Sequence, residues 1–549
     1  MGSHRINSAP NIWRFRTLIA LIFSLVMVLA ACSDTADETT TEVDSETEAT
    51  SADTAADEGD EGEDDETSTT QAEAGGAVLS IAIGAEPGSM DPLLKSDGQR
   101  DAWSFSVLEG LTQRTNEIGV EGIAPLLAES WEVDGTAYVF KLREGVTFHD
   151  GSDFTADDVV ASYTRMLQPD SELLNQFITD DTTVEKVDDF TVRISRPVAD
   201  PLIVSQASLI PIVPAEWADI NDNRLADSMV GTGPYQFDGW EKGQDIRLSR
   251  YEDYWGDEPQ IDEVVIRFLT EEATRLSALQ AGEIQLARNM SPDNVDVAPK
   301  VVAGFVSEVL IVRLNAESGP LSDIRVRQAI NHAIDREAII EEIYGGFAVP
   351  AKGQEVAQYV FGANPDLQDY EYDPELAAQL IQEAGVQGET VVMSATTGHW
   401  AKDREVAEAM AGMIGAAGLT VDLQFPEFSI WVEDLFVAAE DDTLASDLAP
   451  YNHSNELFDS SKTIGQNLEC AGAASTYCNP DVDALAEQAL SETDPEVRSQ
   501  LYQQAWVIMQ EDAAFAAIAD VQQVHFTSED LVWEPPVDGF MRIQFMSFS

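Results

Sequence analysis

Residues 125–132 read PLLAESWE, and residues 138–151 read YVFKLREGVTFHDG. In the second stretch, His149 and Asp150 end a predicted strand, and Gly151 supplies the turn that follows it. Because polar residues beside a turn glycine most often fix the turn itself, we expect His149 and Asp150 to form this turn and not to contact a ligand. The pair of stretches therefore predicts a strand, a tight turn and a further element.

Around this stretch, short β-branched runs interleave with segments of helical periodicity. Residues 78–83 read VLSIAI and residues 264–268 read VVIRF, which is typical of buried strands. The pattern predicts an α/β architecture. Because the folded part extends over about 475 residues, it is too long for one hydrophobic core, and at least two compact units are expected.

Two helices have clear boundary signals. Asp373 fits the N-cap of a helix over residues 374–384, with proline at its first position and Gly385 as the left-handed stop. Thr155 fits the N-cap of a second helix over residues 156–167.

Two other segments are predicted to be structural. Residues 329–344 are expected to form a core-packed helix with ion pairs on its surface, which makes Asp335 and Arg336 scaffold residues. The GTGP loop at residues 231–234 lacks the lysine and the following helix of a nucleotide-binding loop.

The N-terminal segment contains basic residues first, then a run of apolar residues, and then small residues. Arginines precede the apolar residues 18–31, and the segment ends in Leu-Ala-Ala-Cys at Cys32. This order is that of a secretory signal peptide, and it resembles bacterial lipoprotein signals. It predicts a signal peptide over residues 1–31 and lipidation of Cys32, which would anchor the protein outside the cytoplasm. The alternative is an uncleaved transmembrane helix, which usually needs about 20 apolar residues.

The chain is strongly acidic, with a formal net charge of −70. Residues 33–74 hold 17 Asp and Glu and no Lys or Arg, so residues 32–76, with Cys32 at their start, are predicted to be a disordered linker. Nucleic acid is excluded as a partner, because binding to a phosphate backbone requires clustered basic residues. The charge of the remaining surface favours a soluble monomer.

Two cysteines remain, Cys470 and Cys478, eight residues apart. In an oxidising exterior they can form a disulfide. Zinc binding is the weaker interpretation, because the spacing is unusual for zinc and no histidine lies between them.

Several long motifs together resemble the extracytoplasmic solute-binding proteins of the peptide/nickel importer family. Besides the two opening stretches, the motifs are FTADDVV at 154–160, GTGPY at 231–235, YWG at 254–256, PQID at 259–262, VRQAI at 326–330, AIDR at 333–336 and YCNP at 477–480. The resemblance covers nearly all of the chain after residue 77.

The resemblance implies a two-lobed periplasmic-binding-protein-like fold of the large, type II peptide-binding cluster, with the ligand in a cleft between the lobes. By analogy, lobe I takes residues 78–308 with a C-terminal return over 518–549, and lobe II takes residues 309–517. It also implies work with an ABC permease in the membrane. The sequence has no Gly-x-Ser-x-Gly or His-Glu-x-x-His arrangement, so the protein is predicted not to be an enzyme, with a hydrolase that uses two carboxylates as the weaker alternative, and no cofactor or metal is predicted.

Three loops are candidates for the ligand cleft, because ligands in such folds sit where loops leave strand ends. The predicted ligand-binding residues are Thr396, Thr397, Gly398, His399, Trp400, Arg404, Phe428, Trp431, Tyr451, His453, Asn455 and Glu456. They offer hydroxyls, aromatic faces and hydrogen-bonding groups. For Arg404, a surface ion pair with Asp403 or Glu408 is the alternative to a ligand carboxylate.

The third loop departs from the family pattern. Peptide-binding relatives place an aspartate there that pairs with the ligand's α-amino group, whereas residues 453–458 here read HSNELF. Glu456 or Asp459 could replace that aspartate, or His453 and Asn455 indicate a ligand without a free amine. His453 could equally hold the loop by a hydrogen bond.

The resulting prediction is a lipid-anchored receptor that binds an oligopeptide-like or other small polar solute and delivers it to a permease. A ligand-sensing lipoprotein is the main alternative, and a nickel, haem or non-peptide receptor is a variant of the same fold. His399 and His453 would be the histidines to meet across the cleft. The solute itself is not identified by the sequence.

Overall fold

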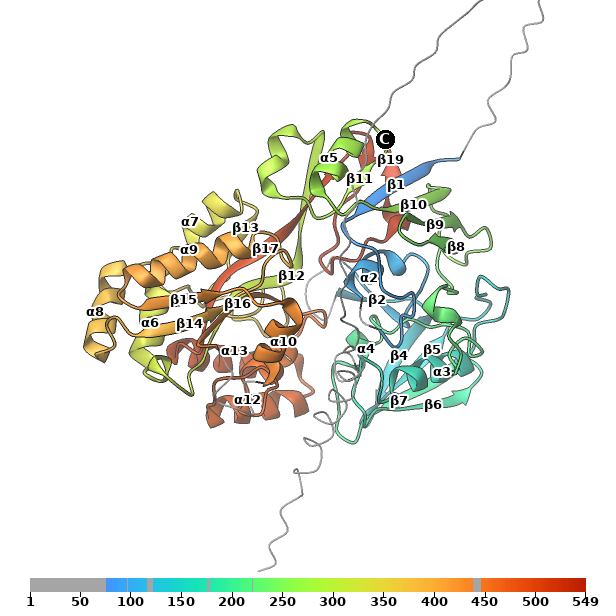
Figure 1. The fold of residues 1–549 in the computed structure, drawn as a ribbon. Helices are drawn as coiled ribbons and strands as arrows, with labels where there is room; N and C mark the ends of the chain where they lie inside the picture. The colour runs from blue at the N-terminus through green and yellow to red at the C-terminus, as the bar shows by residue number, and fades with distance from the viewer. Residues whose placement is uncertain (1–75, 96, 116–121, 175–177, 220, 438–445) are drawn as a thin grey trace, which may run out of the picture. The chain divides into compact units, whose positions relative to one another are not determined.

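The computed structural model describes residues 76–549, with the exception of residues 96, 116–121, 175–177, 220 and 438–445 (Figure 1). The predicted signal peptide, Cys32 and the linker up to residue 75 lie outside the described residues. Within the described part, none of the helices is long and apolar enough to cross a membrane.

The described residues form a large mixed sheet of eleven strands. In spatial order the strands are β15 (Thr420–Gln424), β14 (Thr390–Ser394), β16 (Leu448–Ser454), β12 (Lys300–Leu314), β17 (Phe515–Thr527), β11 (Leu286–Ala287), β1 (Val78–Ile83), β10 (Glu263–Phe268), β9 (Asp245–Arg250) and β8 (Tyr235–Glu241), with β13 (Ala348–Pro350) beside β17. The predicted strands at 78–83 and 264–268 are confirmed as β1 and β10.

Two long antiparallel strands, β12 and β17, connect two hydrophobic regions. One part of their ladder runs from Lys300 to Phe305, and the register shifts before pairing resumes at Val309. Ser307, within this break, adopts a left-handed backbone conformation with φ of 58°. Such a bulge bends a strand and increases its local twist. Both strands therefore change direction between the two regions.

The first region, which we call lobe I, has its main core between β1, β8, β9, β10 and a second sheet. That sheet has the order β4 (Ala128–Asp134), β5 (Ala137–Leu142), β7 (Thr191–Ser195), β6 (Thr183–Asp188). Helices α2 (Gly98–Ser104) and α3 (Ala156–Met166) contribute to the same core. C-terminal residues from Leu531 to Met546 also pack in this core. A smaller core on the other face of β1 includes residues of α5 (Glu272–Gln280) and β11.

The second region, lobe II, has helices on both faces of β14, β16 and β12. Side chains along a strand point alternately to its two faces, so β12 contributes to both cores. Leu310 and Val312 pack in one core, and Val309 and Ile311 pack in the other. The helices are α6 (Ile324–Ala333), α8 (Pro374–Ala384) and α9 (Asp403–Ala416) on the first face, and α10 (Phe428–Val437), α11 (Ser460–Asn467), α12 (Pro480–Ser491) and α13 (Pro495–Glu511) on the second.

The α/β prediction is thus confirmed, and the chain has the two-lobed fold. The exact lobe boundaries, at residues 308/309 and 517/518, stay a prediction, since β12 and β17 run without interruption through both regions.

Both capped helices have the predicted ends. Helix α8 begins after Asp373, whose carboxylate accepts from the Leu376 amide at 2.9 Å, and it stops at Gly385 with φ of 77°. Helix α3 begins after Thr155, whose amide donates to the Asp158 carboxylate at 2.8 Å. These contacts satisfy amide groups that helix starts leave unpaired.

The single helix predicted over residues 329–344 is wrong. Helix α6 ends at Ala333, Ile334 is extended, and a new turn starts where the Asp335 carboxylate accepts from the Ala338 amide at 3.0 Å. Arg336, expected near the surface, is buried and donates to the Ala517 carbonyl at 2.7 Å. The arginine takes this place because the carbonyls of a neighbouring strand need partners in the interior. Asp335 and Arg336 are scaffold residues, as expected.

The turn at residues 149–151 is confirmed. Gly151 has a φ of 82°, and the Asp150 carboxylate accepts from the Ser152 amide at 3.0 Å. His149 joins this turn to the GTGP loop, since its Nε2 lies 2.9 Å from the Gly233 carbonyl oxygen. Burial lowers the pKa of His149 to about 4.

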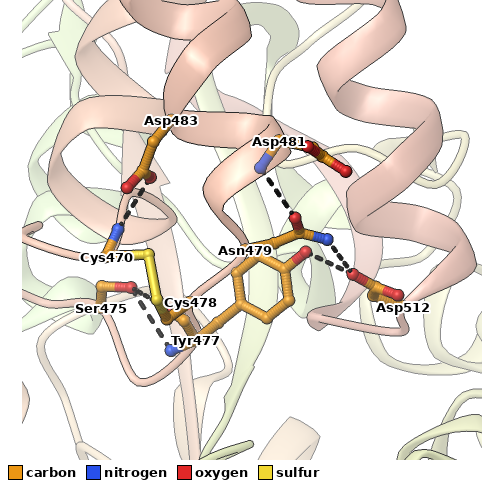
Figure 2. Close-up of a disulfide and its surroundings, with 8 residues drawn as sticks. All are labelled: Cys470, Ser475, Tyr477, Cys478, Asn479, Asp481, Asp483 and Asp512. Atoms are coloured by element: carbon orange, nitrogen blue, oxygen red, sulfur yellow. Dashed lines mark hydrogen bonds between the residues drawn. A yellow bond between two sulfur atoms is a disulfide. The ribbon is translucent and has the colours of Figure 1, made fainter.

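Cys470 and Cys478 form a disulfide, as predicted, in the segment between α11 and α12 (Figure 2). The Cys470 amide donates to Asp483 on α12 at 3.0 Å. Just beyond the disulfide, Tyr477 and Asn479 both donate to Asp512, which follows α13, at 2.6 and 2.8 Å. The closed loop is therefore held against both helices.

Candidate functional site

Three parallel strands of lobe II position the predicted site residues. β14 pairs in parallel with β15, so their carboxyl ends, Ser394 and Gln424, lie side by side, whereas Met393 pairs with Leu448 at the start of β16, which continues to Ser454 beyond them. The residues predicted in three loops lie in the loop after β14, in helix α10 and, for Tyr451 and His453, within strand β16 itself, so the prediction of a third loop there is wrong.

Six of the predicted residues form one connected group of rings, which we call the aromatic cluster. His399 stacks on Phe428 with ring centroids 3.8 Å apart, and Phe428 stacks on Trp431 at 5.9 Å. Trp431 packs edge-on against Trp400 and Tyr451, each at 5.7 Å, and Tyr451 against His453 at 6.2 Å. The loop over residues 396–400, helix α10 and strand β16, which are separate in sequence, thus converge in space.

The aromatic cluster has a buried side and an exposed side. Trp431 is 2% exposed, and its indole N–H donates to the Ser394 carbonyl at 3.2 Å. Phe428 is 42% exposed, and the stacked His399 is also exposed. The outer rings are therefore the ones that can stack on a solute.

Asp403, at the start of α9, organises the loop over residues 396–400. Its carboxylate accepts from the Thr396 hydroxyl at 3.0 Å and from the amides of Gly398 and His399 at 2.9 and 3.0 Å. Thr396 is buried, whereas Thr397 and Gly398 are exposed. The aspartate fixes the backbone from which His399 and Trp400 project.

Arg404 forms the ion pair that was the alternative to a ligand contact. Its guanidinium lies 3.0 Å from the Glu408 carboxylate and stacks over the Phe425 ring at 4.0 Å. It also donates to the Thr397 hydroxyl at 3.3 Å. Its role as a ligand contact stays a prediction.

His453 and Asn455 belong to a buried hydrogen-bond network. His453 Nε2 lies 2.9 Å from the Thr463 hydroxyl, and its Nδ1 lies 3.3 Å from the Asn467 amide nitrogen. Asn455 donates to the same hydroxyl and to the Asp459 carbonyl, both at 2.9 Å. Burial, with a smaller contribution from Lys462, lowers the pKa of His453 to about 3, so its ring is neutral. Both side chains hold the loop to α11.

Neither carboxylate that could replace the amine-binding aspartate is free. Glu456 forms an ion pair with Lys462. Asp459 is buried and makes two contacts with Arg498, at 2.6 and 2.7 Å, in the bidentate geometry that carboxylates and guanidiniums prefer. Within lobe II, the polar groups after β16 are therefore committed to one another.

His399 and His453 do not meet. The rings of Trp400 and Tyr451 lie between them, with Trp400 against His399 at 4.4 Å and against Tyr451 at 6.4 Å. The described residues contain no group of three or more His, Cys, Asp or Glu placed to hold a metal ion.

Sequence reasoning placed every candidate in lobe II and missed the cavities of lobe I. One cavity, of about 300 Å³, is lined by Glu109, Tyr254 and Trp255, and both aromatic side chains donate to the Glu109 carboxylate at 2.9 Å. Burial raises the pKa of Glu109 to about 7. The available signal was the YWG motif at residues 254–256, which supported the family resemblance but was not assigned to a site.

A second cavity, of about 370 Å³, adjoins the first, since Gln113, Arg542 and Phe545 line both. Arg114, the last residue of β2 (Thr112–Arg114), also lines it, and its guanidinium donates to the Leu457 carbonyl of lobe II at 3.3 Å. The second cavity thus lies where lobe I contacts the loop after β16.

The two-lobed α/β fold agrees with the class of protein that the sequence resemblance implies, the extracytoplasmic solute-binding proteins. Residues 122–463 match the family described as "Bacterial extracellular solute-binding proteins, family 5 Middle", and the chain belongs to this family. The family comprises extracytoplasmic binding proteins of ABC importers, which bind peptides or related ligands and are not an enzyme family.

Individual relatives differ in what their names say they bind. The chain is 32% identical over 443 residues to "Heme-binding protein A" of Haemophilus influenzae, covering 73% of this chain and 79% of that protein. It is 29% identical over 504 residues to "Dipeptide-binding protein" of Escherichia coli, covering 82% and 90%.

Solved structures agree on the fold. A periplasmic binding protein DppA from Helicobacter pylori in complex with the peptide STSA has a TM-score of 0.71 at 24% identity, over 86% of this chain and 98% of that chain. A peptide-binding protein AppA from Clostridium difficile has a TM-score of 0.77 at 21% identity, over 86% and 100%.

Proposed function

We propose that this protein is a membrane-tethered receptor that encloses an oligopeptide-like or other small polar solute between its lobes and delivers it to an ABC permease. The observation that supports the proposal is the convergence of the loop over residues 396–400, helix α10 and strand β16 into the aromatic cluster. Exposed Phe428 and His399 offer stacking faces to a solute.

Binding would act by shifting a conformational equilibrium. A solute that contacts both lobes favours the closed arrangement by the difference in its affinity for the two states. The bulge in β12 at Ser307 is the segment in which we expect the strands to bend. The chemistry at the site is then recognition, without bond cleavage.

The identity of the solute is tested by mass spectrometry of what co-purifies with residues 75–549. We expect a stoichiometric small molecule that is lost or weakened in Phe428→Ala. A matched control is Val133→Ala, which changes an exposed apolar residue on β4, far in sequence from the cluster. Retention of the same solute by Phe428→Ala with unchanged affinity would contradict the proposed stacking role.

Membrane tethering is tested separately through Cys32. We expect the wild-type chain in the membrane fraction and Cys32→Ala in the soluble fraction, because the proposed lipid is attached to that sulfur. A Cys32→Ala variant that stays in the membrane fraction would refute the anchor.

A haem receptor is the second candidate, supported by the relative named "Heme-binding protein A". A Soret absorption band after addition of hemin, reduced in His399→Ala, is the result expected from this candidate. His453→Ala is a poor probe, since His453 holds Thr463 and Asn467. A ligand-sensing role would instead appear as solute-dependent binding to a signalling partner and not to a permease.

A further inference from the structure

Glu355 is a buried carboxyl group next to the aromatic cluster, in the segment between β13 and α8. The residue is 2% exposed, and its carboxyl oxygen Oε2 accepts from the Asn467 amide at 3.0 Å. The residues that follow it, Val356 and Ala357, pack in the same hydrophobic core as Tyr451. Because an ionised carboxylate in such a core is costly unless it is paired, its neighbours decide whether this group keeps a proton.

Among the described residues, Glu355 has no counter-charge beside it. Burial raises its pKa to about 8. From β16, Tyr451 and His453 lie in the same network; burial raises the pKa of Tyr451 and lowers that of His453 to about 3, so both are neutral at pH 7. Arg313 of β12 acts on Tyr451 and Lys462 of α11 acts on His453, but neither cation acts on the pKa of Glu355. Glu355 therefore gains or loses its charge alone.

The Asn467 amide, at the end of α11, is shared among three acceptors. Besides its contact with Glu355, its nitrogen lies 3.2 Å from the Tyr451 hydroxyl and 3.3 Å from Nδ1 of His453. An amide nitrogen carries two N–H groups, so it cannot donate to all three acceptors at once. The amide oxygen of Asn467 has no hydrogen-bond partner among the described residues. The competition among the three acceptors therefore decides where the two N–H groups point.

The proton on Glu355 changes the outcome of this competition. An ionised carboxylate is the strongest acceptor of the three, because charge-assisted hydrogen bonds are stronger than neutral ones. It therefore takes one N–H group and leaves a single one for Tyr451 and His453. A protonated carboxyl is a weaker acceptor, so that both N–H groups become available to the two rings. Since both rings belong to the aromatic cluster, the cluster is held more firmly when Glu355 carries its proton.

Resting on the proposed function, we propose that Glu355 is a regulatory proton-binding site, and that its protonation strengthens solute binding at the aromatic cluster. The direction also follows from burial. A solute that covers the exposed side of the cluster removes water from it, and this removal disfavours the ionised carboxylate further. Solute and proton then favour each other's binding by the same factor, as linkage requires. The only step is exchange of a proton between the carboxyl group and water.

The first experiment asks whether Glu355 titrates in the ligand-free, full-length protein. Tryptophan fluorescence, to which Trp400 and Trp431 of the cluster contribute, is recorded from pH 5 to pH 9 for wild type and Glu355→Gln. Glutamine has nearly the shape of a protonated glutamate and cannot ionise, so the variant keeps the packing of the site. We expect a transition centred at about pH 8 in wild type that is missing in Glu355→Gln.

The matched control for this titration is Asp447→Asn. Asp447 is another carboxyl group of lobe II whose pKa is raised by burial, and it accepts from the Val392 amide at 2.8 Å. We expect this variant to keep the transition of wild type. A second variant, Glu355→Asp, retains a carboxyl group that can titrate and should keep a transition at a shifted pH.

The second experiment measures the Kd of the dipeptide Ala-Phe by calorimetry at pH 6, 7, 8 and 9. Because the amine of Ala-Phe itself titrates at about pH 8, the measured quantity is the ratio of the wild-type Kd to the Kd of Glu355→Gln at each pH. We expect this ratio to rise at least about threefold from pH 6 to pH 9, since wild type alone loses the proton that favours binding. Asp447→Asn should follow wild type.

Identical fluorescence titrations of wild type and Glu355→Gln would overturn the inference, and so would a Kd ratio that is constant or falls with pH. A lowered Tm of Glu355→Gln together with a constant ratio would assign Glu355 to the scaffold, with the same consequence. Failure of the proposed function has a different signature. Wild type that binds neither Ala-Phe nor hemin at any of these pH values would refute solute binding and its coupling to Glu355, whereas the ligand-free titration decides the proton site by itself.

Discussion

The aromatic cluster of lobe II and the Arg114 cavity of lobe I are built in opposite ways. In lobe II, the polar groups next to the rings satisfy one another: Asp459 with Arg498, and His453 with Thr463. In lobe I, Arg114 keeps two nitrogens without partners. Satisfied buried networks stabilise one conformation, whereas an unpaired charge is available to a ligand. The comparison teaches that the buried groups Asp459 and His453 around β16 are satisfied within the protein, whereas two nitrogens of Arg114 are not.

The largest effect is expected from Asp459→Asn in lobe II. This change leaves Arg498 buried without its counter-charge, and the free energy of unfolding should fall by roughly 3 to 5 kcal/mol. Urea unfolding followed by fluorescence measures it. Asp227→Asn, in the exposed ion pair with Lys242, is the control and should cost less than about 1 kcal/mol. Equal effects of the two variants would show that the Asp459 network is not a scaffold.

Within the aromatic cluster, Trp431→Ala should reduce the free energy of unfolding by about 3 kcal/mol, because it removes a buried side chain and leaves a cavity. Phe428→Ala, at the exposed end, should change stability by less than about 1 kcal/mol. Thermal melting checks both. If Phe428→Ala is as destabilising as Trp431→Ala, the cluster has no exposed side that is free for solute contact.

The disulfide next to this scaffold should contribute about 2 to 3 kcal/mol, the chain-entropy value for a loop this short. Cys470→Ser with Cys478→Ser, and wild type in dithiothreitol, should melt at the same lowered Tm. Unchanged melting in the double variant would mean that the contacts of Tyr477 and Asn479 with Asp512 hold the loop alone.

Each lobe has one buried glutamate whose protonation makes the stability of the fold depend on pH. Glu355 of lobe II has one side-chain donor, Asn467 at 3.0 Å, whereas Glu109 of lobe I has three. Burial raises the pKa of Glu355 to about 8 and that of Glu109 to about 7. The pKa of Glu109 rises less because its three hydrogen-bond donors favour the ionised carboxylate and so oppose the effect of burial. A raised folded-state pKa means that the folded protein binds the proton more tightly. Each group therefore stabilises the fold most below its ordinary pKa of 4.5, and this contribution declines as pH rises towards the folded value.

We therefore expect Glu355→Gln to remove a decline of up to about 1.4 kcal/mol per pH unit between pH 4.5 and 8. Urea unfolding of wild type and variant at pH 5, 6, 7 and 8 measures it. Parallel stability curves would show that Glu355 is ionised in the folded protein.

Much of the fold was predictable because its signals are local. Asp373 and Gly385 act within one turn of the helix they bound, and β1 and β10 are recognised by their own β-branched residues. The loop over residues 396–400 was also found in this way, since it follows a recognisable strand, whereas Tyr451 and His453, expected in a loop, lie within β16. That α10 and β16 meet this loop in one cluster depends on the parallel pairing of β14 with β15 and β16.

Other features depend on partners far away in the sequence. The break at Ile334 and the burial of Arg336 require the carbonyl of Ala517, 181 residues later. Asp459 was considered for a ligand amine and instead pairs with Arg498, 39 residues away.

By itself the sequence determined the α/β architecture, the family, the helix boundaries and the loops that carry aromatic residues, because strand periodicity and helix caps act over a few residues. Only the tertiary structure decided which polar groups form hydrogen bonds and ion pairs within the scaffold and which keep unpaired donors. Arg114 lies against Leu457 and Phe458, more than 340 residues away, and no local pattern encodes such a contact. The physical reason is that the burial and pairing of a charged residue depend on how the whole chain packs, and not on the residues next to it in the sequence.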